Sequence, residues 1–228
     1  MIIPEQVRRI GALVLLAALL CGAEAGHVRA ADTAATEFKK GEAAYAAGDF
    51  AQAAKVWRPL AEKGDAQAQY AMGLLARRGL GVPRDPEAAA QWWRKAANQG
   101  HTIAQFNLGV LYESGEGVRK SYDEAFKWYR LAAERGDPDA QFNLGLLYAA
   151  GHGVKRDLNA AAGWYRKAAE QGDAAAQYTL GLAYAAGMGV TEDRATALAW
   201  LNKSAAQGFQ PARDALTKLA PEPKEKKR

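Results

Sequence analysis

Residues 112–120 read YESGEGVRK, and this stretch raises a choice between two kinds of protein. A G-x-G spacing after a predicted helix can belong to a loop that holds phosphate groups, which would indicate a nucleotide enzyme. The same pattern returns as GLGV at Gly79, GHGV at Gly151 and GMGV at Gly187, so that the copies follow one another every 36 residues. A catalytic loop is needed once, so a loop used repeatedly at constant spacing indicates architecture. The loops also lack the Gly-Lys-Ser/Thr sequence of a phosphate-binding loop, and they follow no predicted strand, which argues against nucleotide binding.

Other positions repeat with the same period. Aligned at 36 residues, the recurring positions are Gly73, Gly109, Gly145 and Gly181, then Trp92, Trp128, Trp164 and Trp200, then Gln69, Gln105, Gln141 and Gln177. Each copy therefore predicts one unit of local structure.

The first half of each unit predicts a helix, called helix A below. In the second copy it covers Thr102 to Ser114, where Ala104, Leu108 and Leu111 form one apolar stripe. Gly115 follows where a helix ends in the left-handed conformation that glycine adopts cheaply. Glycine in the middle of a helix costs about 1 kcal/mol relative to alanine. We therefore expect another helix to pack closely against the glycines of the Gly109 register.

The second half predicts helix B, which carries large aromatic residues and closely spaced alanines. Its N-cap slot holds Asp85, Ser121, Asp157 and Asp193, residues that favour a helix start. Ser121 with Glu124 also predicts a capping box.

One helix pair cannot bury its own apolar face, whereas stacked neighbours can. The sequence therefore predicts an all-α protein, a right-handed α-solenoid of stacked antiparallel helix pairs. Four repeats are expected in the segment 65–209, at 65–100, 101–136, 137–172 and 173–208. A shorter helix pair is expected before them at 36–64, a capping helix after them at 210–220, and a disordered tail at 221–228.

Residues 1–30 predict a signal peptide with cleavage after residue 25 or 30. Arg8 and Arg9 precede an apolar run of about 11 residues, shorter than the roughly 20 that a membrane span needs, and small residues follow. Two alternatives are a twin-arginine export signal and lipid attachment at Cys21. A third is an uncleaved N-terminus that anchors the chain in the inner membrane.

Cys21 is the only cysteine and lies in the segment expected to be removed, so the mature chain would form no disulfide or thiolate metal site. The net charge is +5, and the two ends, residues 1–30 and 221–228, carry most of it. A nucleic-acid partner is therefore not expected, because such binding needs a concentrated basic face. No stable membrane span is expected after signal cleavage.

The combined pattern A-x-A-Q-F-x-L-G-x-x-Y-x-x-G-x-G-V, followed by A-x-x-W-Y-x-x-A-A-x-x-G, resembles the Sel-1-like repeat family of the tetratricopeptide superfamily. The resemblance covers residues 65–209, and residues 38–64 are closer to a plain tetratricopeptide unit. It implies an adaptor or scaffold that binds a protein or peptide partner. One exported, cysteine-rich branch is linked to β-lactam binding and hydrolysis, but the mature part of this chain has no cysteine to pair.

The resemblance also implies a binding groove on the concave side, formed by the helices A. Carried over to this sequence, the partner-binding residues are Tyr70, Leu74, Ile103, Phe106, Asn107, Val110, Asp139, Phe142, Asn143, Leu146, Tyr178, Thr179 and Leu182. Asn107 and Asn143 would hold a peptide backbone, and the aromatic rings would cover its side chains. The alternative is that the rings are ordinary packing between helices and that the asparagines are plain polar surface positions.

No catalytic, cofactor-binding or metal-binding residue is predicted. His101 and His152 fall about one and a half repeats apart, and no motif supplies convergent partners for either. We expect a monomeric periplasmic or secreted adaptor that is not an enzyme. The alternatives are an envelope enzyme acting on β-lactam or cell-wall compounds and a membrane-tethered structural adaptor.

Overall fold

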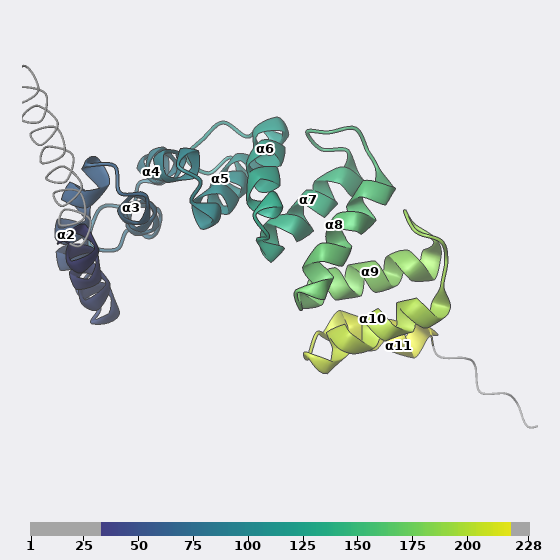
Figure 1. The fold of residues 1–228 in the computed structure, drawn as a ribbon. Helices are drawn as coiled ribbons and strands as arrows, with labels where there is room; N and C mark the ends of the chain where they lie inside the picture. The colour runs from purple at the N-terminus through teal and green to yellow at the C-terminus, as the bar shows by residue number, and fades with distance from the viewer. Residues whose placement is uncertain (1–32, 220–228) are drawn as a thin grey trace, which may run out of the picture.

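The computed structural model describes residues 33–219 (Figure 1), so the expected signal peptide and tail lie outside the described residues. Residues 33–46 are helical. The helices that follow are α2 (Phe50–Glu62), α3 (Ala66–Arg78), α4 (Pro86–Asn98), α5 (Thr102–Ser114), α6 (Tyr122–Glu134), α7 (Pro138–Ala150), α8 (Leu158–Glu170), α9 (Ala174–Ala186), α10 (Arg194–Ala206) and α11 (Gln210–Leu219). Every regular element in this part of the chain is a helix, which confirms the all-α prediction.

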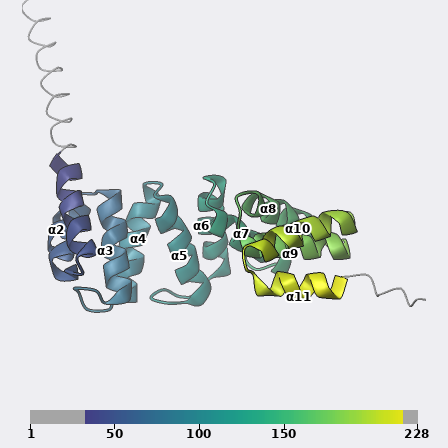
Figure 2. The same ribbon diagram turned by 90° about the horizontal axis from the view of Figure 1, so that it is seen from below.

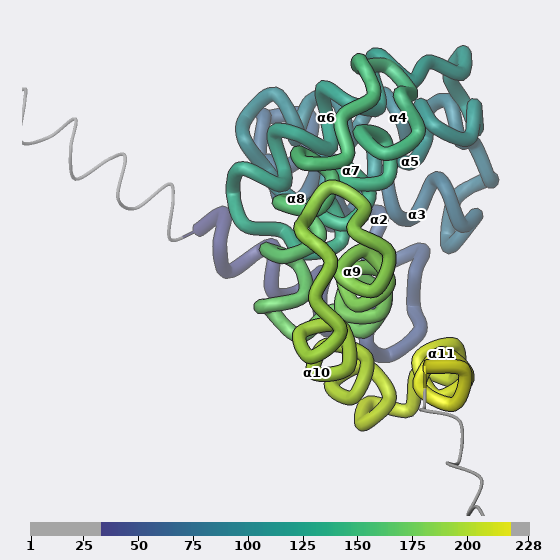
Figure 3. Tube along the Cα trace, turned by 90° about the vertical axis from the view of Figure 1, so that its right-hand side faces the viewer, coloured from purple at the N-terminus to yellow at the C-terminus, as the bar shows by residue number. Residues whose placement is uncertain are grey.

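The helices stack as a solenoid of pairs. Helices α3, α5, α7 and α9 are the helices A, and each packs against the helix B that follows it in sequence and against the helix B before it. The pairs follow one another in a curved row from α2 to α11 (Figures 1 and 2), and Figure 3 looks onto the end that holds α9 to α11. This arrangement confirms the predicted α-solenoid.

The predicted N-caps of the helices B are confirmed, but the capping box is only half formed. The Oγ atom of Ser121 accepts a hydrogen bond from the backbone N–H of Glu124 at 3.3 Å. The Glu124 carboxylate does not reach back, because it accepts a hydrogen bond from Trp128 Nε1 at 3.0 Å. The backbone N–H of Ser121 instead donates to the carbonyl of Tyr112 at 2.9 Å. The reciprocal bond of the box was therefore predicted wrongly, since the aromatic neighbour provides a competing donor.

The glycines in the middle of the helices A face large side chains of the helices B. A Cβ atom added at Gly73 would lie 2.3 Å from the Trp93 ring, and one at Gly109 would lie 2.6 Å from the Tyr129 ring. This confirms the expected close helix contact, because any larger residue would separate the two helices.

Each G-x-G loop connects helix A to helix B within a repeat and contacts the preceding repeat. Gly115 ends α5 with φ 81°. Gly117 has φ 70°, and a Cβ atom there would lie 2.3 Å from the backbone of Pro86 in the first turn of α4. The loop of the second repeat therefore packs on the helix B of the first repeat, so the second glycine is required by contact as well as by conformation.

A chain of buried glutamines also links the repeats. Gln105 and Gln141 are almost fully buried, and each donates its Nε2 atom to a carbonyl of the preceding helix B, at 3.0 Å and 3.2 Å. The Oε1 atom of Gln141 accepts from Nε2 of Gln171 at 2.8 Å, and Gln171 donates in addition to the Gly136 carbonyl at 2.9 Å. These bonds hold successive helices A in a fixed register.

Within residues 33–219, none of the helices combines the length and the apolar composition that a membrane span requires.

Candidate functional site

The residues predicted to bind a partner lie at equivalent positions on successive helices A. Tyr70 and Leu74 come from α3, and α5 provides four more, which are Ile103, Phe106, Asn107 and Val110. The other members are Asp139, Phe142, Asn143 and Leu146 on α7 and Tyr178, Thr179 and Leu182 on α9. We call the surface formed by these residues the helix-A face. The glutamine chain and the loops that hold the repeats in register also align this face.

The phenylalanine rings of the face are partly buried in contacts between helix A and helix B of the same repeat. The ring of Phe106 lies 5.7 Å from that of Tyr129, and Phe142 lies 5.7 Å from Tyr165. These rings pack helices A against helices B, so a partner could not stack on the ring faces that these contacts cover.

The asparagines differ from the rings, because their polar groups are not used inside the chain. Asn107 and Asn143 are half-buried, and their side-chain amides make no hydrogen bond within residues 33–219. Each amide offers two donors and one acceptor oxygen, the set that a peptide backbone can pair with.

Exposed apolar side chains mark the same face. Among residues 33–219 the large apolar residues with most exposure are Ile103 at 50%, Leu146 at 41% and Met188 at 46%. Two of the three belong to the helix-A face, whereas the helices B bury their large apolar residues more completely. Each of these two aliphatic side chains lies within four residues of an asparagine on the same helix, so apolar and polar groups are exposed close together.

Charged side chains gather where the loop of the second repeat meets α3. Glu116 Oε2 accepts from both Nε and Nη2 of Arg77, at 3.2 Å and 3.0 Å. Glu116 Oε1 accepts from Arg84 at 2.7 Å. The three charges satisfy one another and fix the loop to the preceding repeat.

His101 caps α5 at a position where three other helices A begin with aspartate. Its Nδ1 atom accepts from the backbone N–H of Ala104 at 3.2 Å, and its ring stacks on Tyr70 at 4.8 Å. Burial lowers the pKa of His101 below the ordinary 6.5, because the charged form loses hydration. His152 lies in the loop of the third repeat, where it stacks on the ring of Tyr122 at 4.2 Å. His101 and His152 thus have different neighbours, and the structure does not bring them together.

Two buried tyrosines stay protonated at physiological pH. Burial raises the pKa of Tyr129 far above its ordinary value, and the hydrogen bond to Glu113 at 2.7 Å adds to the shift. Burial raises the pKa of Tyr165 to about 12. Within residues 33–219, no group of three or more His, Cys, Asp or Glu side chains could hold a metal ion.

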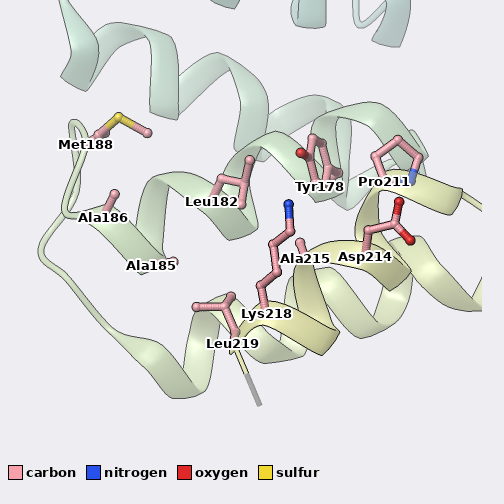
Figure 4. A pocket seen from close by; sticks show the side chains of 10 residues that line it. All are labelled: Tyr178, Leu182, Ala185, Ala186, Met188, Pro211, Asp214, Ala215, Lys218 and Leu219. Carbon is pink, nitrogen blue, oxygen red and sulfur yellow. The ribbon is translucent and has the colours of Figure 1, made fainter. Parts of the chain in front are cut away.

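A pocket of about 510 Å³ opens at the C-terminal end of the helix-A face, between α9 and α11 (Figure 4). Its lining residues are Tyr178, Leu182, Ala185, Ala186, Met188, Pro211, Asp214, Ala215, Lys218 and Leu219. Sequence reasoning found the first two and missed the rest. A signal was available, since one further step of 36 residues from Tyr178 and Leu182 reaches Asp214 and Lys218.

Comparison with solved structures shows the same architecture in bacterial proteins. A protective antigen of uropathogenic Escherichia coli strains is 39% identical with a TM-score of 0.78, over 82% of this chain and 41% of that protein. The present chain thus spans less than half of that protein. A Sel1 repeat protein from Oxalobacter formigenes is 38% identical with a TM-score of 0.75, over 78% of this chain and 74% of its own length. No curated protein matches the chain significantly.

The Sel1 repeat pattern matches residues 66–101, 102–137, 138–173 and 174–209, well over half of the chain. These segments carry the loop glycines, the buried glutamines and the helices A that form the face described above. The chain is therefore a member of the Sel1 repeat family.

Proposed function

We propose that this protein is an exported adaptor that binds a protein or peptide partner along its helix-A face. Sel1 repeats generally serve protein–protein interaction, which supports the adaptor role. The partner's backbone would pair with the amides of Asn107 and Asn143, and its apolar side chains would cover Ile103 and Leu146.

The observation that carries the proposal is the combination of exposed aliphatic groups with unpaired amides on one face. Ile103 and Leu146 are exposed at 50% and 41%, and they lie four and three residues from Asn107 and Asn143, which make no hydrogen bond within residues 33–219. A partner that covers both features would gain apolar burial and hydrogen bonds together. The partly buried rings would contribute their edges and hold the repeats rigid.

The sequence of residues 1–30 supports export, since it has the layout of a signal peptide. N-terminal sequencing of the protein recovered from cell fractions tests this part. A mature chain that starts after residue 25 or 30 in the periplasm or the medium is expected. An intact N-terminus in the inner-membrane fraction would instead favour the membrane-tethered adaptor.

In-cell photo-crosslinking tests the binding face. Ile103 or Leu146 is replaced by a photo-reactive phenylalanine analogue, and Lys127 on α6, which is exposed outside the face, serves as the control position. We expect one dominant protein adduct from both face positions and none from the control, with its identity given by mass spectrometry. Equal adducts at all three positions, or none on the face in cells that contain the folded protein, would contradict the proposal.

We propose no catalytic role for the charged groups near this face. Arg77 and Arg84 are paired with Glu116, and Glu113 accepts from Tyr129, so each has a packing role. No observation here favours the envelope-enzyme alternative over the adaptor.

A further inference from the structure

The pocket between α9 and α11 is produced by a change of residue types at the last step of the repeat. The first residues of α11 follow those of α9 by 36 positions, and Ala212 and Ala215 are buried against the α10 residue Leu201. Helix α11 is thus in register with the helices A. At the position of Asp214 the other helices A carry an aromatic ring, in Tyr70, Phe106, Phe142 and Tyr178. At the position of Lys218 they carry an aliphatic side chain, in Leu74, Val110, Leu146 and Leu182.

The substitutions leave apolar space that nothing in the described chain fills. Asp214 stands in place of an aromatic ring, and Lys218 stands in place of an aliphatic side chain. Helix α11 therefore fills less apolar space than the helices A of the inner repeats. The facing wall on α9 and its loop remains apolar, with Leu182, Met188 and small alanines between them (Figure 4). A volume of about 510 Å³ can hold more than one large apolar side chain, and lies within the range of ordinary ligand clefts.

The charge at the pocket mouth indicates what must accompany the apolar group. Lys218 extends from α11 toward Leu182 and Tyr178 (Figure 4), and it forms no ion pair within residues 33–219. Asp214 already accepts a hydrogen bond from Gln210 Nε2 at 2.8 Å. Lys218 is exposed, and a ligand that places an anionic acceptor beside its ammonium group gains a charge-assisted hydrogen bond that a purely apolar ligand lacks.

We infer that this pocket anchors the partner through a large apolar side chain that has an acidic residue beside it in the partner's sequence. The apolar group enters between α9 and α11, and the partner's carboxylate pairs with Lys218. The inference rests on the proposed function, because it places the end of the bound peptide on the same row of helices. It adds a requirement on the partner's sequence that the inner repeats do not impose.

Selection from a phage-displayed random dodecapeptide library, with peptides fused through their C-termini so that they carry no free carboxylate, tests the inference on the full chain. We expect enriched peptides to contain Leu, Ile, Met or Phe with Asp or Glu within three positions. Synthetic copies with amidated C-termini are then measured by fluorescence anisotropy. Ala186→Trp, which fills the pocket from an exposed position, and Lys218→Glu should each weaken binding by about tenfold or more.

A charge exchange makes the test specific. A peptide whose acidic residue is replaced with lysine should bind the Lys218→Glu variant and should not bind the unaltered protein. Lys167→Glu, the same charge change on α8, should leave binding unaltered, and unchanged circular dichroism would show that the variants are folded. Enriched peptides that lack Asp or Glu near the apolar residue, or that bind Lys218→Glu as tightly as the unaltered protein, would overturn the inference.

The failure of the inference can be told apart from failure of the proposed function. Peptides that bind Ala186→Trp and Lys218→Glu normally but lose affinity for Leu146→Asp would overturn the pocket inference alone. If no peptide is enriched, both the pocket inference and peptide binding by the helix-A face are contradicted.

Discussion

At the scale of single residues, two glycines with the same backbone conformation have different reasons to be glycine. Gly117 and Gly136 both have positive φ, 70° and 93°. A Cβ atom at Gly117 would lie 2.3 Å from the Pro86 backbone, whereas nothing lies within 4 Å of a Cβ atom at Gly136. The first position therefore keeps two repeats in contact, and the second only ends a helix.

The comparison gives a stability prediction. Gly136→Ala should lower the free energy of unfolding by about 1 kcal/mol, the cost of the left-handed conformation for a residue with a Cβ atom. Gly117→Ala should cost about 3 kcal/mol, because a backbone clash adds to the same conformational cost. Urea unfolding followed by circular dichroism measures both. Equal losses would show that the loop does not need its contact with α4.

A second residue-scale prediction concerns His101. Burial lowers its pKa in the folded protein, so the folded state favours the neutral ring, whose Nδ1 atom caps α5. The stabilisation is complete above the unfolded pKa of 6.5 and is lost as the pH falls from there through the lowered folded pKa. The protein should therefore melt at a lower temperature at about pH 5 than at about pH 8.

The variant His101→Asp should remove most of this pH dependence, because aspartate stays an acceptor throughout that range. The three other Sel1 repeats begin their helices A with aspartate, so the replacement suits the site: Asp65, Asp137 and Asp173. His152→Asn serves as the control and should keep the pH dependence of the unaltered protein. A melting temperature of His101→Asp that still falls with pH as in the unaltered protein would show that other groups are responsible.

At the scale of helices, the buried glutamines make similar bonds in successive repeats, and only at Gln105 does an arginine, Arg135, replace the glutamine donor. Gln141 donates to the Ala133 carbonyl of α6 and accepts from Gln171 at the end of α8, so it joins three helices. The buried amide is used on both sides, which explains why glutamine recurs at this position in each repeat.

Gln141→Leu should therefore lower the free energy of unfolding by about 2 kcal/mol, since it removes two hydrogen bonds from a buried site and leaves their partners short of a bond. Gln171→Leu also breaks the bond to Gln141, but Gln171 is exposed, so water can reach the freed acceptors and the loss should be smaller, about 1 kcal/mol. Chemical denaturation of both variants compares the two losses. A larger loss for Gln171→Leu would contradict the role assigned to Gln141.

The period of 36 residues was sufficient to predict these helices, and their caps followed from local residue types. Side-chain hydrogen bonds could not be predicted in the same way. Glu124 accepts from Trp128 one turn along the same helix instead of completing the capping box, and the sequence pattern is compatible with either bond. His101 acts as an N-cap although histidine is not a usual one, and its ring stacks on Tyr70 of the preceding helix A, a contact that spacing alone does not reveal.

At the scale of the whole molecule, the repeats align equivalent positions of α3, α5, α7 and α9, and exposed apolar side chains occur on the helix-A face at Ile103 and Leu146. The ion pairs of Glu116 with Arg77 and Arg84 lie beside this face. The sequence places the proposed binding residues at equivalent positions of successive repeats. It did not predict which rings are partly buried, because the cover of Phe106 comes from Tyr129 on another helix. It also left Asp214 and Lys218 out, because the groove was counted over four repeats only.

The most direct test of the helix-A face as a binding surface is the affinity of the double variant Ile103→Asp, Leu146→Asp for the protein captured by photo-crosslinking at residue 146. Both side chains are exposed, so the melting temperature should stay unchanged. Titration calorimetry should show binding weakened by about tenfold or more, with no loss for Lys127→Asp, Lys167→Asp on the helices B. An affinity equal to that of the unaltered protein would contradict the proposal that partners bind on the helices A.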